Sequence, residues 1–175
     1  MKTKPEYREQ REELKTLCDS ILADRHLTRK IHYNLEVTGS NRGWTHVNMM
    51  LSTPKRIVYN ISVPEWALVK HGMNYAKAYA IHELCHLITG TSHNHDKLFK
   101  HNEMIIMKRF LGAAKIVRNK RTYIHKAYNL AGESLFDIDK DRQQVYNPEN
   151  QNRLQGVENG AENRESKTDQ NSAGI

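Results

Sequence analysis

The sequence predicts an α+β fold, in which an N-terminal helix is followed by a small sheet of three strands and then by further helices. Two patterns carry this prediction. Apolar residues near the N-terminus recur at the three- and four-residue spacing of an amphipathic helix, whereas residues 31–37 and 44–51 alternate between two faces as half-buried strands do. The chain has 175 residues, which is the length of one domain. No run of about 18 apolar residues occurs, so no transmembrane helix is expected.

The first helix is predicted over residues 5–24. One side of it is apolar, at positions that follow the helical repeat. These positions are Leu14, Leu17, Cys18, Ile21 and Leu22. The rest of this helix is mostly charged and is expected to face the solvent, so the helix is predicted to be scaffold without chemistry of its own.

Three strands are predicted, at residues 31–37, 44–51 and 56–63. The first two alternate in polarity, and the third is rich in β-branched residues. Turn-forming residues separate the strands at 38–43 and 52–55. Consecutive strands are therefore expected to pair as hairpins and to form a small, mainly antiparallel three-stranded sheet.

The next predicted helix carries the pattern His-Glu-Leu-Cys-His at positions 82–86. Residues four apart lie on one face of a helix, so His82 and His86 can bind one metal ion. Glu83 lies beside them, where a carboxylate can accept a proton from a metal-bound water. Apolar residues occupy the other side of the helix, and Gly90 is expected to end it. This pattern predicts a peptidase-type zinc site, and the alternative is a surface helix with two histidines.

A catalytic zinc ion usually has three protein ligands and one open position. Four later residues are candidates for the third ligand: His93, His95, His101 and Glu103. His95 is favoured because it directly precedes a predicted helix whose expected N-cap is Asp96, and His93 is its main rival. Cys85 lies between the two motif histidines but is expected to pack in the core.

The pattern at 82–86, with His95 and Phe99 at the start of a later helix, resembles the SprT-like and WLM-like zinc peptidases, the Spartan-type enzymes. In that family a third histidine ligand and an aromatic core residue follow with the spacing H-x-x-x-F. The resemblance covers roughly residues 10–112 and implies a zincin-like minimal metallopeptidase fold. The loop after His86 is shorter than in Spartan, and the cysteines of the zinc ribbon that often follows are absent.

The resemblance implies a zinc-dependent endopeptidase with one catalytic Zn²⁺ on His82, His86 and His95. Glu83 would act as the general base that activates a zinc-bound water for attack on a peptide bond of a protein or peptide substrate. The strand at 56–61 is expected to bind the substrate backbone by edge pairing, which predicts weak sequence preference.

A basic block lies between residues 97 and 126, with nine Lys or Arg residues and one acidic residue. Clustered positive charge attracts a phosphate backbone, and Spartan-type enzymes cleave proteins crosslinked to DNA, so single-stranded or damaged DNA is an expected partner. The candidate nucleic-acid contacts are Lys115, Arg118, Lys120, Arg121 and Lys126. The alternative is a solvated basic face of the helix predicted over 113–130.

Composition divides the chain into two parts. Residues 1–131 are predicted to form the metallopeptidase domain, which ends in the basic helical segment. Residues 132–175 contain nine acidic and five basic residues and are predicted to form an acidic, polar and largely disordered tail. The charged N-terminal residues do not resemble a secretory signal, and the two cysteines form no paired motif. A cytoplasmic protein is therefore expected, with nucleoid or nuclear association if DNA is a partner.

A second hypothesis comes from another functional class. The chain could be a DNA-binding protein or regulator that keeps a peptidase-like fold with a structural or inactive zinc site. A closed site, with His93 or Cys85 as a fourth protein ligand, would favour this hypothesis, whereas an open position for water favours the enzyme.

Overall fold

The computed structural model describes residues 2–90, 95–118 and 124–139. His93, Lys120, Arg121 and the predicted tail beyond residue 139 lie outside the described residues. The chain divides into two compact units, Met1–Ile138 and Asp139–Ile175, and all the helices and strands described below belong to the first unit.

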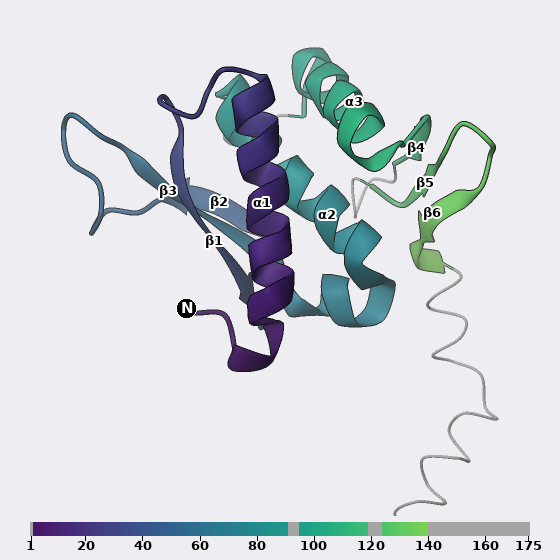
Figure 1. Cartoon of the computed structure of the whole chain (residues 1–175), viewed down its shortest axis with the longest axis horizontal. Helices are drawn as coiled ribbons and strands as arrows, with labels where there is room; N and C mark the ends of the chain where they lie inside the picture. The colour runs from purple at the N-terminus through teal and green to yellow at the C-terminus, as the bar shows by residue number, and fades with distance from the viewer. Residues whose placement is uncertain (1, 91–94, 119–123, 140–175) are drawn as a thin grey trace, which may run out of the picture. The chain divides into compact units, whose positions relative to one another are not determined.

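The fold is α+β, as the sequence predicts, with three α-helices and two small three-stranded sheets among the described residues (Figure 1). A short 3-10 helix, Pro5–Tyr7, precedes the first α-helix. The elements follow in this order: α1 Arg8–Asp24, β1 His32–Thr38, β2 Trp44–Val47, β3 Val58–Pro64, α2 Glu65–Thr89, α3 Lys97–Leu111, β4 Lys115–Val117, β5 Lys126–Tyr128 and β6 Ser134–Asp137. In the described part of the chain, no helix combines the length and the apolar character needed to cross a bilayer.

The first sheet is mixed, so the prediction of a mainly antiparallel sheet built from consecutive hairpins is wrong. Its strand order is β1-β3-β2, with β1 parallel and β2 antiparallel to β3. The strand β3 has the most buried side chains of the three and occupies the centre, while the short, half-exposed β2 lies at an edge. Because both sides of β3 are paired, this strand cannot bind a substrate by edge pairing as predicted.

Two strands of the second sheet, β4 and β5, lie where a helix was predicted over residues 113–130, and that prediction is wrong. The third strand, β6, lies at the start of the segment predicted to be a largely disordered tail. The strands β4, β5 and β6 form an antiparallel sheet in sequence order. Gly112 ends α3 in the left-handed conformation, and the β-branched Ile116 and Val117 that follow favour a strand. The first unit extends to Ile138 and includes β6, whereas the sequence placed the end of the domain at residue 131.

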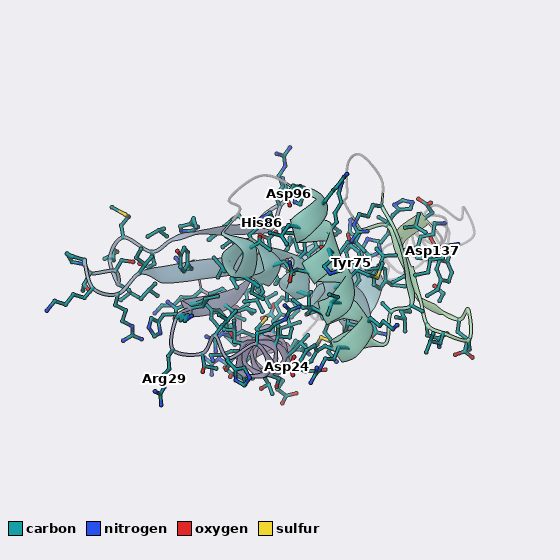
Figure 2. The ribbon with its side chains drawn as sticks, turned by 90° about the horizontal axis from the view of Figure 1, so that it is seen from above. Asp24, Arg29, Tyr75, His86, Asp96 and Asp137 are labelled. Atoms are coloured by element: carbon teal, nitrogen blue, oxygen red, sulfur yellow. The ribbon has the colours of Figure 1, made fainter. Side chains whose placement is uncertain are left out.

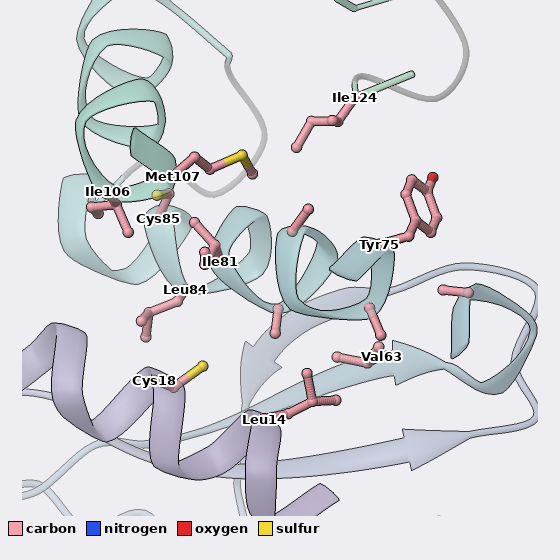
Figure 3. Close-up of a cluster of buried hydrophobic side chains, with 14 of the residues drawn as sticks. Leu14, Cys18, Val63, Tyr75, Ile81, Leu84, Cys85, Ile106, Met107 and Ile124 are labelled. Atoms are coloured by element: carbon pink, nitrogen blue, oxygen red, sulfur yellow. The ribbon is translucent and has the colours of Figure 1, made fainter. Parts of the chain in front are cut away.

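The core lies between one face of the first sheet and the helices α1 and α2, and it continues to α3 and the second sheet (Figure 3). Leu35 pairs with Ile61, and Val37 with Val63, so these four buried residues alternate onto the same face of the sheet. The helix side of the core includes Leu14, Cys18, Ile81, Leu84 and Cys85. The predicted packing role of Cys85 is confirmed, because this side chain is fully buried in the core.

The helix α2 positions the candidate site because it runs through the middle of the core. It contains a break at Gly72, whose positive φ of 77° is readily adopted only by glycine. Beyond this break the helix continues to Thr89 and ends at Gly90, which is left-handed as predicted. The motif histidines therefore lie on the second part of α2, whose neighbouring residues Ile81, Leu84 and Cys85 are buried in the core.

Candidate metal centre

Three histidines from two neighbouring segments converge at the end of α2. His82 and His86 lie one turn apart on this helix, and His95 precedes α3; Figure 2 shows His86 near Asp96, the residue after His95. The possible ligand atoms of the three side chains all lie within 4.8 Å of one another. The Nε2 atoms of His82 and His95 are 3.1 Å apart, close to the ~3.4 Å expected between two nitrogens on one tetrahedral zinc ion. This group could therefore hold a metal ion.

The start of α3 places His95 in this group. Asp96 is the N-cap of α3, as predicted, and its carboxylate accepts a hydrogen bond from the backbone N–H of Phe99 at 2.7 Å. The fully buried ring of Phe99 lies 4.6–5.1 Å, centroid to centroid, from each of the three imidazoles. Phe99 thus packs against all three candidate ligands and limits their side-chain rotation.

A buried carboxylate holds the first histidine. Glu103 of α3 is 1% exposed, and its Oε1 lies 2.6 Å from Nδ1 of His82. Its Oε2 accepts hydrogen bonds from Nε and Nη2 of Arg118, at 3.2 and 2.6 Å. Burial raises the pKa of Glu103, but its contacts with His82 and Arg118 outweigh this effect and hold the pKa below its ordinary value. The ionised carboxylate can then only accept, so Nδ1 of His82 carries the hydrogen.

From the sequence, Glu103 was only a weak candidate for a metal ligand, because it lies among residues that were expected to be solvated. The structure places its side chain behind His82, in the shell around the candidate ligands. A signal for this position existed, since Phe99, Glu103, Ile106 and Met107 follow the helical repeat and are the buried residues of α3. An acidic residue on an apolar helix face indicates a buried partner.

His95 is held in its neutral form. Burial, followed by the proximity of His82 and His86, lowers the pKa of His95 to about 4. Metal ions bind the neutral imidazole, so a histidine that stays unprotonated at neutral pH does not have to lose a proton when a metal ion binds.

The predicted general base lies against the edge strand β2. Glu83 is buried, and the hydroxyl of Thr45 on β2 donates to its Oε2 at 3.0 Å. Burial raises the pKa of Glu83, although electrostatic interaction with His82 and the hydrogen bond from Thr45 act in the opposite direction. The residue before β2, Gly43, also lies close, and its N–H donates to the hydroxyl oxygen of Tyr79 at 3.1 Å.

Of the candidate nucleic-acid contacts, the structure describes Lys115, Arg118 and Lys126, and these three lie on or next to β4 and β5 instead of on one helix face. Arg118 binds Glu103, and Lys126 forms an ion pair with Asp137 at 3.0 Å. Lys115 is exposed on β4, with its ammonium 6.0 Å from the centroid of the Tyr128 ring. Two of the three described candidates thus have carboxylate partners within the domain.

Comparisons of the chain with protein-family models, with curated proteins and with solved structures find no match. The resemblance to SprT-like peptidases therefore depends on the sequence pattern and spacing alone, and the enzymatic function stays a prediction.

Proposed function

We propose that the protein is a zinc-dependent endopeptidase of SprT-like type, with a metal site formed by His82, His86 and His95. The observation that carries this proposal is the convergence of the three imidazoles next to a buried carboxylate, Glu83. Three nitrogen donors with a fourth position left for solvent are the usual donor set of a catalytic zinc site. The fully buried Cys85 belongs to the core cluster, which argues against it as a fourth ligand, while His93 lies outside the described residues.

The donor set fits zinc, because neutral imidazole is one of its preferred ligands and the pKa of His95 keeps that residue neutral. When bound, the ion would polarise a peptide carbonyl and lower the pKa of a coordinated water. Glu83 would accept a proton from the attacking water and later donate it to the leaving amine. Its raised pKa suits both steps, and Thr45 holds one of its two oxygens in a fixed direction.

We propose that the substrate pairs with β2. This strand lies at the edge of the first sheet, and its residue Thr45 touches Glu83, so its backbone passes beside the proposed general base. An extended polypeptide that pairs with β2 would lie across the metal site through main-chain hydrogen bonds, which predicts weak sequence preference. This assignment replaces the expectation that residues 56–61 provide the edge.

Apolar side chains are exposed at the end of β2 and in the connection that follows it. Five large apolar residues at the end of β2 and in the connection to β3 are 39–95% exposed: Val47, Met49, Met50, Leu51 and Ile57. Methionine adapts to differently shaped apolar partners. We therefore propose that extended segments with apolar side chains are preferred substrates.

Two measurements test the proposal. Metal analysis of the purified, zinc-supplemented protein should find one bound zinc ion, and casein should be cleaved. The change Glu83→Gln should leave zinc bound and lower turnover by about 10²–10⁴-fold, whereas Glu9→Gln, at an exposed position on α1, should change neither. The proposal would be refuted by full activity in the Glu83→Gln variant or by wild-type protein that binds no zinc.

We also propose DNA as a partner, because the chain carries a net charge of +7 and α3, which begins just after His95, exposes three lysines. These lysines are Lys97, Lys100 and Lys108. Binding of single-stranded DNA should weaken steeply with salt and should decrease when the three lysines are replaced by glutamine. Casein cleavage rates measured with and without single-stranded DNA would show whether DNA binding changes the peptidase activity.

A further inference from the structure

Glu103 links the candidate metal centre to a part of the chain outside the sequence motif. Its two carboxylate oxygens have different partners: Oε1 lies 2.6 Å from Nδ1 of His82 on α2, and Oε2 accepts both hydrogen bonds from Arg118. Arg118 directly follows β4. One buried carboxylate therefore connects α2, α3 and the end of the first strand of the second sheet.

The position of Glu103 is costly for an acidic residue. It belongs to the buried face of α3 with Phe99 and Ile106, where an apolar side chain would normally pack. A carboxylate is tolerated in such a place only if its hydrogen bonds and charge are matched. Arg118 matches the charge and is itself partly buried, with 24% of its side chain exposed. Both oxygens of the buried carboxylate thus have hydrogen-bond partners, as a stable buried polar group requires.

This hydrogen-bond network determines which ring nitrogen of His82 carries the hydrogen. An acceptor-only carboxylate at Nδ1 requires the hydrogen of the neutral imidazole to be on Nδ1. The lone pair of the ring is then on Nε2, the atom that lies 3.1 Å from Nε2 of His95. The two hydrogen bonds from Nε and Nη2 of Arg118 go to Oε2, and Oε1 lies against Nδ1 of His82.

We propose that Glu103 and Arg118 form a positioning pair, which fixes the tautomer and orientation of His82 and thereby strengthens metal binding at His82, His86 and His95. The second sheet contributes to the metal site through Arg118. This inference rests on the proposed metal site but not on peptidase activity, because its direct consequence is a metal affinity.

The first test measures the dissociation constant for Zn²⁺ by competition with a chromophoric chelator, using the full chain. Removing a carboxylate partner of a histidine ligand typically weakens metal binding by about 10–100-fold, and we expect this loss for Glu103→Gln. Arg118→Gln should give a smaller loss, since Glu103 remains. The matched control is Lys126→Gln, which breaks the Lys126–Asp137 ion pair in the same sheet and should leave the affinity unchanged.

The second test measures the tautomer of His82 directly, which distinguishes an effect on this ring from a general loss of structure. In the metal-free protein, ¹⁵N NMR of the His82 ring should show the hydrogen on Nδ1, and Glu103→Gln should shift the ring toward a mixture of tautomers. Wild-type affinity in both variants, or an unchanged tautomer in a folded Glu103→Gln variant, would overturn the inference. If the Glu103→Gln variant does not fold, the Zn²⁺ affinity of the Arg118→Gln variant alone tests the inference, and a wild-type value would overturn it. Protein that binds zinc with the expected losses but cleaves no peptide would refute the proposed function while supporting this inference.

Discussion

The substitution Gly43→Ala tests how closely the β1–β2 connection packs against the proposed general base. A Cβ atom at this position would overlap with Cε1 of Tyr79 and would lie 2.9 Å from the carbonyl oxygen of Ser62 and 3.0 Å from Oε1 of Glu83. The Ser62 oxygen belongs to the backbone of the central strand and cannot move easily. The Tyr79 ring makes an edge contact with Trp66, and its hydroxyl oxygen accepts a hydrogen bond from the N–H of Gly43. These contacts restrict the movement of Tyr79.

The magnitude follows from two opposing terms. Adding a methyl group to a filled site typically costs about 1–3 kcal/mol, whereas Gly→Ala reduces the freedom of the unfolded chain and stabilises by about 0.4–1 kcal/mol. Because three neighbouring groups are too close at Gly43, the first term should dominate, with a net loss of about 1–2 kcal/mol in the free energy of unfolding. The same displacement should disturb Glu83 and lower peptidase activity.

Urea unfolding followed by circular dichroism measures this loss, and the same connection provides a control. At Gly39 a Cβ would meet only Oε2 of Glu65, at 3.8 Å, and neither glycine has a positive φ. Gly39→Ala should therefore be as stable as the wild type or slightly more stable. Equal stability of the Gly43→Ala and Gly39→Ala variants would refute the packing argument.

Three further predictions concern the site edge and the core. Thr45→Val removes the hydroxyl that stabilises ionised Glu83; the pKa of Glu83 should rise, and since a general base must be ionised, the acidic limb of the kcat/KM profile should move to higher pH. A profile that does not move would show that this hydrogen bond has no effect on the base. Met50→Ser, at a side chain that is 95% exposed, should raise KM for apolar peptides without changing kcat or the unfolding temperature; an unchanged KM would exclude Met50 from substrate contact. Leu84→Ala, in the buried core, should cost about 2–5 kcal/mol in urea unfolding, whereas Ile105→Ala, at an exposed position on α3, should cost much less; similar costs at both positions would argue against this core.

Features that depend on neighbours in the sequence were predictable. Helix α1 follows the apolar spacing of residues 5–24, and Asp96 caps α3 as its residue type indicates. The H-E-x-x-H spacing placed His82 and His86 on one face, because four residues make about one turn of any helix. Together with the segment that presents His95, these local rules were sufficient to nominate the three residues that the structure brings together.

Features that depend on partners far along the chain were decided only by the tertiary structure. The strand β3 enters between β1 and β2 because it has the most apolar surface to bury, and no local turn signal encodes that choice. The strands β4 and β5 lie in a basic segment that was predicted as a helix, and β6 lies in a segment that was predicted as part of the tail, because each strand is short and depends on pairing with its neighbours. The role of Glu103 follows from His82 and Arg118, which lie 21 and 15 residues away in the sequence. A buried carboxylate is acceptable only where a fold supplies both partners at once, and that match exists only in three dimensions.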